Sequence, residues 1–227
     1  MKKTVLLVAF TCCAIVMNAQ NPKGMFSIKP MAGINVVGLT GGSNSDMFKS
    51  KVGFTAGVEA EYGVSDWLGV SLGALYSQQG ANEAQGDFDA VSKLKSHYLN
   101  LPLIANVYIP GVQGLAVKAG VQVGFCLKSE MEVMLETYVA EPYSTGELNR
   151  QKVGMMETGL CKSVDFGIPV GLSYEYKNFV LDARYYIGLT KVGKVYQILS
   201  DYHIDHPAIT SSRNSFFSFT LGYRFHL

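Results

Sequence analysis

Charged side chains are scarce in this chain, and neither sign predominates. Asp, Glu, Lys and Arg make up 16% of the 227 residues, and the net charge is +1. Soluble domains carry about 25% charged residues. A near-zero net charge gives no indication of a nucleic-acid-binding surface or of a surface for acidic ligands. The low charge content indicates instead that much of the folded surface does not face water.

Long apolar runs are also absent, with one exception at the beginning of the chain. Two lysines precede an apolar segment over Thr4–Met17, the order of regions that is typical of a secretory signal peptide. This segment is shorter than the about 20 residues that a membrane-spanning helix needs. We therefore predict a cleaved signal peptide over 1–19 and a single domain over 20–227. Without a later apolar run, the exported domain is periplasmic, secreted, or a barrel in an outer membrane.

What the chain has in abundance is alternation of apolar and polar residues. In 115–128, for example, Val117, Val121 and Phe125 alternate with Lys118 and Gln122. A hydrophobic period of two predicts β-strands. Eight such segments are predicted, over 25–37, 52–63, 67–80, 97–109, 115–128, 161–176, 179–190 and 214–227.

The connections between these segments alternate between short and long. Three are tight, at 64–66, 110–114 and 177–178. Short and long loops that alternate collect at opposite ends of a sheet, which is the plan of outer-membrane barrels. Four connections are long and polar, over 38–51, 81–96, 129–160 and 191–213. Within the third of these, we expect Met131–Tyr138 to continue the preceding strand beyond the membrane.

The composition of the two strand faces decides between a membrane barrel and a soluble, lipocalin-like barrel. A soluble barrel turns its apolar face inward and needs a water-facing exterior rich in Lys and Glu. Here the polar face consists mainly of Gly and Ser, which suits a narrow interior better than a solvent coat. We predict an all-β fold, an eight-stranded antiparallel transmembrane up-and-down β-barrel. Aromatic residues near strand ends are expected to form its girdles: Tyr62, Trp67, Tyr76, Tyr98, Tyr108, Tyr174 and Tyr185.

The charged residues on the small-residue face are then expected to lie inside the barrel. Buried charges must be paired or hydrated, and the two signs are nearly balanced on this face. We predict a salt-bridged polar network that plugs the lumen, with a position near the rim in water as the alternative for any single member. The predicted lumenal charge network comprises Glu59, Glu61, Lys118, Asp165, Glu175, Asp182, Arg184 and Arg224, with Lys29 as a further basic residue.

Two cysteines, Cys126 and Cys161, lie outside the predicted signal peptide and flank the longest loop. Parity places both on the inward face. An exported protein is in an oxidising environment, where antiparallel neighbours at matching height reach disulfide geometry. The pair is a possible disulfide, with two unbridged small residues as the alternative.

The last segment alternates aromatic and leucine residues with small and polar ones as far as the final residue. A last strand pairs with the first to close a barrel. In outer-membrane proteins such a terminal aromatic strand resembles the signal that the assembly machinery reads. The predicted assembly-signal strand consists of Phe217, Phe219, Leu221, Tyr223 and Phe225.

Several short patterns resemble those of the outer-membrane β-barrel proteins of Bacteroidetes, the porin family or PorT-like group. They include the Y-L-x-x-P-L strand at Tyr98–Leu103, the strand at Gly73–Tyr76, Asp165-Phe166-Gly167 and Asp182–Tyr185. The resemblance implies a cell outer membrane protein without a demonstrated pore. Two positions depart from the family pattern: Asn106 stands where Lys is frequent, and the chain ends in His226-Leu227 instead of Phe.

No pattern predicts catalysis or a cofactor. Ser96 and His97 are adjacent in a strand and point to opposite faces, so they form no nucleophile–base pair. Asp201, His203, Asp205 and His206 are metal-binding residue types, but a polar loop collects them by composition. We therefore predict no catalytic residue, no metal site and no cofactor.

The function predicted from the sequence is a non-enzymatic outer-membrane barrel with a structural or binding role through its long extracellular loops. The expected partners are outer-membrane lipid, the barrel assembly machinery and an unknown protein or surface ligand at the loops, but not nucleic acid. A small porin-like channel or a secretion or motility accessory barrel is the first alternative. A secreted lipocalin-like ligand carrier is the second.

Overall fold

The structure of the protein is a computed structural model. It describes residues 23–40, 48–49, 51–83, 91–137, 147–154, 163–191 and 213–227. Within these residues, no helix has the length and apolar character needed to cross a membrane.

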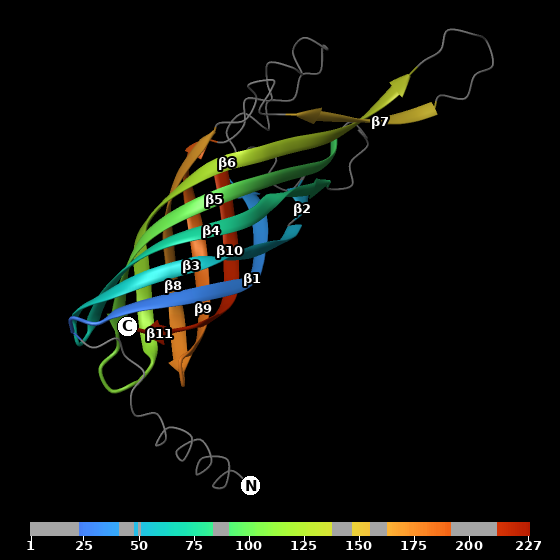
Figure 1. Cartoon of the computed structure of the whole chain (residues 1–227). Helices are drawn as coiled ribbons and strands as arrows, with labels where there is room; N and C mark the ends of the chain where they lie inside the picture. Colours follow the sequence, from blue (N-terminus) through green and yellow to red (C-terminus); the bar gives the residue numbers. More distant parts are fainter. Residues whose placement is uncertain are drawn as a thin grey trace, which may run out of the picture.

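Eight long antiparallel strands form a closed barrel (Figure 1). Each strand pairs with its neighbour in the chain, and β1 also pairs with β10 through Met31–Thr40, which closes the ring. The predicted fold class is confirmed, and all eight predicted segments are strands. The eight are β1 (Phe26–Thr40), β3 (Lys51–Ser65), β4 (Leu68–Glu83), β5 (Val91–Tyr108), β6 (Leu115–Thr137), β8 (Val164–Tyr176), β9 (Phe179–Lys191) and β10 (Arg213–Tyr223).

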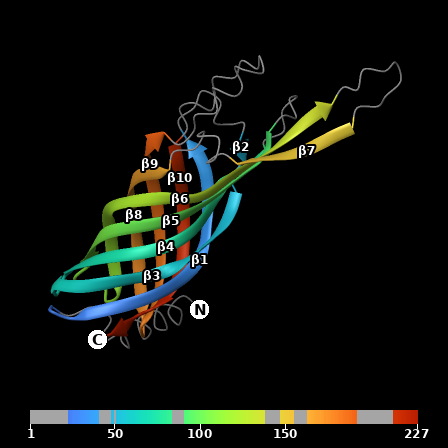
Figure 2. The ribbon, with the colours of Figure 1, turned by 45° about the horizontal axis from the view of Figure 1, so that its top comes forward.

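Three shorter strands complete the sheet. β2 (Phe48–Lys49) pairs with β4, and β11 (Phe225–His226) pairs with the start of β1 at Ser27 and Ile28. β7 (Glu147–Gly154) pairs with β6 over Glu130–Thr137. The hairpin of β6 and β7, here called the arm, projects beyond the barrel in both views (Figures 1 and 2).

The arm agrees with the sequence prediction in one strand and differs from it in the other. The expected continuation of the preceding strand over Met131–Tyr138 is confirmed as far as Thr137. The partner strand β7 lies inside a segment predicted as loop. Its sequence, ELNRQKVG, lacks the alternation that predicts a strand. The segment forms a strand because its backbone pairs with β6.

The two ends of the barrel differ in their connections. One end carries the tight turns at 66–67, 109–114 and 177–178, and is called the turn end. Lys177 and Asn178 both have positive φ, 47° and 71°, as a two-residue type I′ hairpin requires. The opposite end, from which the arm projects, is called the arm end.

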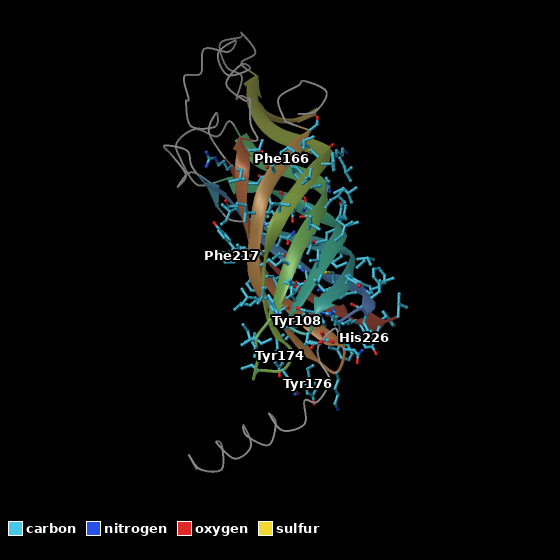
Figure 3. The ribbon with its side chains drawn as sticks, turned by 90° about the vertical axis from the view of Figure 1, so that its left-hand side faces the viewer. Tyr108, Phe166, Tyr174, Tyr176, Phe217 and His226 are labelled. Atoms are coloured by element: carbon cyan, nitrogen blue, oxygen red, sulfur yellow. The ribbon has the colours of Figure 1, made fainter. Side chains whose placement is uncertain are left out.

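The apolar face of the strands is the outside of the barrel. On β10, Phe219 and Leu221 are 49% and 52% exposed, whereas Thr220 between them is 6% exposed. Figure 3 shows Phe166 and Phe217 projecting away from the barrel wall. A soluble lipocalin-like carrier requires the opposite arrangement, so the second functional alternative is wrong.

The predicted aromatic girdle is correct in part. Tyr62, Trp67 and Tyr174 are 51%, 54% and 41% exposed and lie near the turn end. Tyr98 and Tyr108 are only 2% and 3% exposed, so their assignment to the girdle is wrong. The outward positions of β5 have odd numbers, and both tyrosines therefore face inward.

A substitution at an outward position in the middle of a strand tests whether the apolar face is the outside of the barrel. We expect Phe219→Arg to destabilise the protein in lipid vesicles, lowering its free energy of unfolding by about 2–4 kcal/mol, because a cation at the bilayer midplane is costly. The measurement is urea unfolding of the vesicle-inserted protein, followed by its heat-modifiable gel shift. Phe225→Arg is the matched control, since Phe225 is equally exposed at 51% but lies at the turn end, where the cost falls to about 0–1 kcal/mol. Equal folding of both variants would contradict the assignment of faces.

Candidate functional site in the barrel interior

Five charged side chains meet near the middle of the lumen and form the central cluster. Lys29 Nζ lies 2.9 Å from Glu59 Oε2 and 3.5 Å from Asp182 Oδ2. Arg184 donates from Nε to Asp182 Oδ1 at 2.6 Å and also pairs with Glu59. Lys118 pairs with Asp182, and its Nζ lies 3.7 Å from Glu59 Oε2. None of these side chains is more than 8% exposed.

The central cluster spans the lumen because its members come from strands on opposite sides of the ring. Lys29 lies on β1 and Glu59 on β3, whereas Lys118 lies on β6 and Asp182 and Arg184 lie on β9. Strands β1 and β6 are four places apart in a ring of eight. Their side chains therefore reach across the interior to the same two carboxylates.

Glycines on β4 provide the room for the acidic members on β3. A Cβ on Gly73 would lie 2.9 Å from Cγ of Glu59 and 3.0 Å from Cγ of Pro102. A Cβ on Gly69 would lie 2.4 Å from Oε1 of Glu61. A larger residue at either position would require the glutamate side chain beside it to shift, so the small residues on this face are part of the site.

A second group, the turn-end cluster, surrounds Arg224. Its guanidinium contacts Glu61 Oε2 at 3.0 Å through Nη1 and Glu175 Oε2 at 2.8 Å through Nε. Tyr108 donates its hydroxyl hydrogen to Glu61 Oε1 at 2.5 Å and accepts from Arg224 Nη2 at 3.1 Å. His226 Nε2 lies 4.0 Å from Glu175, and Figure 3 places Tyr108 and His226 at this end of the barrel.

The two clusters have opposite charge balances. The central cluster holds three basic side chains against two carboxylates, an excess of one positive charge. In the turn-end cluster Arg224 faces the carboxylates of Glu61 and Glu175, an excess of one negative charge. The clusters balance each other, which limits the electrostatic cost of placing charge inside the membrane.

Asp165 stands apart from both clusters, on the arm-end side of the lumen. It is 2% exposed, and its Oδ2 accepts a hydrogen bond from Asn214 Nδ2 at 3.1 Å. Among the described residues it has no ion-pair partner. The neighbouring interior is apolar, since Tyr186 stacks on Phe216 with ring centroids 4.8 Å apart and Val37 packs with both.

Between the central cluster and these aromatic rings the interior is lined by uncharged polar residues. Asn35 donates from Nδ2 to Ser77 Oγ at 2.7 Å, and Gln79 donates from Nε2 to the same oxygen at 3.2 Å. A cavity of about 20 Å³ is lined by Asn35, Asn100 and Gln122, and also by Arg184 of the central cluster and the Tyr186 and Phe216 rings. This volume accommodates about one water molecule.

The structure thus brings seven of the eight predicted lumenal residues into two separate groups and leaves Asp165 outside them. The central cluster also contains Lys29, the further basic residue that was expected on this face. The structure adds Tyr108 and Ser27, whose Oγ accepts a hydrogen bond from Arg224 at 3.1 Å. The aromatic pattern near the strand ends assigns Tyr108 to the girdle, whereas its hydroxyl lies in the turn-end cluster. Parity along β5, read from Leu101 and Leu103, was the signal that could have found it.

The remaining predictions divide between described and undescribed residues. Cys126 is inward and 5% exposed, but Cys161 lies outside the described residues, so the disulfide stays a prediction. The segment Asp201–His206 also lies outside them.

The structure places Ser96 and His97 on opposite faces of β5. Ser96 faces inward and forms a hydrogen bond with Ser129 at 2.8 Å, whereas His97 forms a hydrogen bond with Tyr76 on the outside. The described residues contain no group of three or more His, Cys, Asp or Glu side chains that could hold a metal ion.

Comparison with known proteins places this barrel in a family. The family described as outer membrane protein beta-barrel domain matches residues 18–193. The chain belongs to this family. Membership locates the protein in the outer membrane, in contact with its lipid, and confirms the predicted localisation.

Solved structures with similar architecture are outer-membrane barrels of low sequence identity. Ail of Yersinia pestis, solved with the heparin analogue sucrose octasulfate, is 15% identical with a TM-score of 0.45, and the match covers 89% of this chain and 99% of Ail. Neisserial surface protein A is 15% identical with a TM-score of 0.46, covering 88% and 97%. The N-terminal barrel of Pseudomonas aeruginosa OprF is 14% identical with a TM-score of 0.36, covering 89% and 98%. No curated protein sequence matches the chain.

Removing a carboxylate from the central cluster tests its contribution to stability. Glu59→Gln keeps the side-chain shape but leaves three basic groups with the single carboxylate of Asp182. Breaking a buried pair in this way costs about 3–5 kcal/mol, which denaturant unfolding in detergent measures. Glu130→Gln is the matched control, because its pair with Lys128 is exposed and such pairs contribute about 0.2–1 kcal/mol. Equal losses would show that the central ion pairs contribute no more than a surface pair.

Proposed function

We propose that this protein is a non-enzymatic, non-conducting outer-membrane barrel that displays an extracellular binding surface. The observation that carries the proposal is the central cluster, in which side chains from β1, β3, β6 and β9 meet across the lumen. Interiors of eight-stranded barrels are just wide enough for side chains to fill. An ion that passed through would have to separate buried ion pairs, which is costly without replacement partners.

The finer identity that we propose is membership of the Bacteroidetes porin family or PorT-like group. The sequence patterns that carry this resemblance are structural in the barrel. Asp182 and Arg184 of the Asp182–Tyr185 pattern belong to the central cluster, and Gly73 makes room for Glu59. These patterns support a closed barrel, and the word porin in the family name describes the architecture.

Orientation follows from the general plan of outer-membrane barrels, in which short turns are periplasmic and long connections extracellular. We accordingly place the turn end in the periplasm and the arm outside the cell, after removal of the signal peptide over 1–19. The last strand, with Phe217, Phe219, Leu221, Tyr223 and Phe225, is proposed as the signal for the assembly machinery. Loops and hairpins on a rigid scaffold are common binding elements, which favours the arm as the element that engages a protein or surface ligand.

A planar-bilayer recording tests the closed lumen. We expect the purified wild-type protein to give no current steps above background, with a general porin as the positive control in the same bilayer. The double variant Glu59→Ala/Arg184→Ala removes two side chains that cross the lumen and leaves the cluster's net charge unchanged. We expect it to conduct. Reproducible steps from the wild type would support the channel alternative instead.

Surface labelling on intact cells tests the orientation. Gln151→Cys, on β7 of the arm, is expected to react with a membrane-impermeant maleimide on intact cells. Asp66→Cys, in the exposed turn between β3 and β4, is expected to react only after the outer membrane is permeabilised. The wild-type protein measures the background from its native cysteines. The reverse pattern would mean that the barrel is inserted the other way round.

A further inference from the structure

The outer wall changes from apolar to charged along one line across β5 and β6. On β6 the outward residues Val121, Phe125 and Leu127 are 57%, 40% and 54% exposed. The next residue, Lys128, has a side chain that is 62% exposed. On β5, among the residues whose side chains the structure describes, the outward ones nearest the arm are His97 and Lys95. Because lipid-facing residues are apolar, this line marks the edge of the membrane on this part of the wall.

A β-bulge in β6 creates the boundary. Tyr98 pairs with Cys126 and His97 pairs with Lys128, which leaves Leu127 as the extra residue. Cys126 before the bulge and Ser129 after it both face inward, at 5% and 2% exposed. The bulge therefore turns two successive residues outward. Under regular alternation, Lys128 would point into the lumen.

The bulge brings Lys128 next to a small group of polar side chains. Lys128 Nζ lies 2.7 Å from Glu130 Oε1, and Lys95 stands opposite Glu130 in the register. Among the side chains that the structure describes at this level, two ammonium groups face one carboxylate, which is a net positive charge. The Tyr76 hydroxyl lies 2.5 Å from His97 Nδ1, and when it donates there the ring proton is on Nε2. His97 then offers a further donor at the same level.

We propose that Lys95, His97 and Lys128 bind a phosphate group of the glycolipid in the outer leaflet. The ligand is a phosphorylated, acylated sugar of the lipid A class. Its phosphate is complementary to the net positive charge and the N–H donors of this group, as in other basic clusters at membrane surfaces. Its acyl chains lie along the apolar wall that begins at Leu127. The site is outside the barrel and does not involve the lumen.

The proposal rests on the orientation given above, which places the arm end in the outer leaflet. Its test is therefore made on purified full-length protein in detergent, where binding does not depend on orientation in the cell. Titration with bisphosphorylated lipid A is followed by native mass spectrometry. The double variant Lys95→Gln/Lys128→Gln is expected to bind at least about tenfold more weakly than the wild type.

The matched control is Lys23→Gln/Lys177→Gln, which removes the same charge from two exposed lysines at the turn end. We expect it to bind lipid A as the wild type does. Lys128→Arg keeps the charge and is expected to retain binding. Heat-modifiable migration on a gel verifies that each variant is folded.

Three results would overturn the proposal. The first is an equal loss of binding in the turn-end control. The second is equal binding of dephosphorylated lipid A by the wild type, which would mean that the wall recognises acyl chains alone. The third is displacement of lipid A by an equal concentration of inorganic phosphate, which would mean that the site binds free phosphate and not a headgroup.

Discussion

The constraint on which the whole structure depends is that backbone N–H and C=O groups cannot remain unpaired in lipid. A sheet satisfies this constraint only when its first and last strands pair, and here Met31–Thr40 of β1 pairs with Arg213–Gly222 of β10. β11 continues the pairing to the start of β1. The chain is thereby committed to a narrow ring of eight strands, and every inward side chain must fit within it.

The interior of so narrow a ring leaves little room for water, so its charged groups must satisfy one another. Glu59 and Asp182 each have more than one basic partner in the central cluster, and Glu61 and Glu175 share Arg224 in the turn-end cluster. The glycines on β4 also contribute to this arrangement, because they leave the glutamate side chains space that a larger residue would occupy.

The barrel fold and the direction in which each strand face points could be predicted from the sequence. Both depend only on the alternation of apolar and polar residues along a strand. Thr220 and Phe219 occupy the faces that alternation assigned to them. The division of the charges into two groups could not be predicted, because it depends on register between strands far apart in the chain, such as β3 and β9. β7 was missed because ELNRQKVG is ordered by pairing with β6 and not by its own pattern.

Parity also has a limit within a single strand, and the bulge at Leu127 shows it. Alternation in 115–128 places Lys128 on the lumenal face with Lys118 and Gln122, yet the extra residue turns it outward at the point where the apolar wall ends. A regular strand would have placed its ammonium group inside, on the same side as Cys126. One extra residue in the strand thus decides whether the Lys128 ammonium group lies inside the barrel or outside it. The same strand contributes Lys118 to the lumen and Lys128 to the outer wall of the barrel.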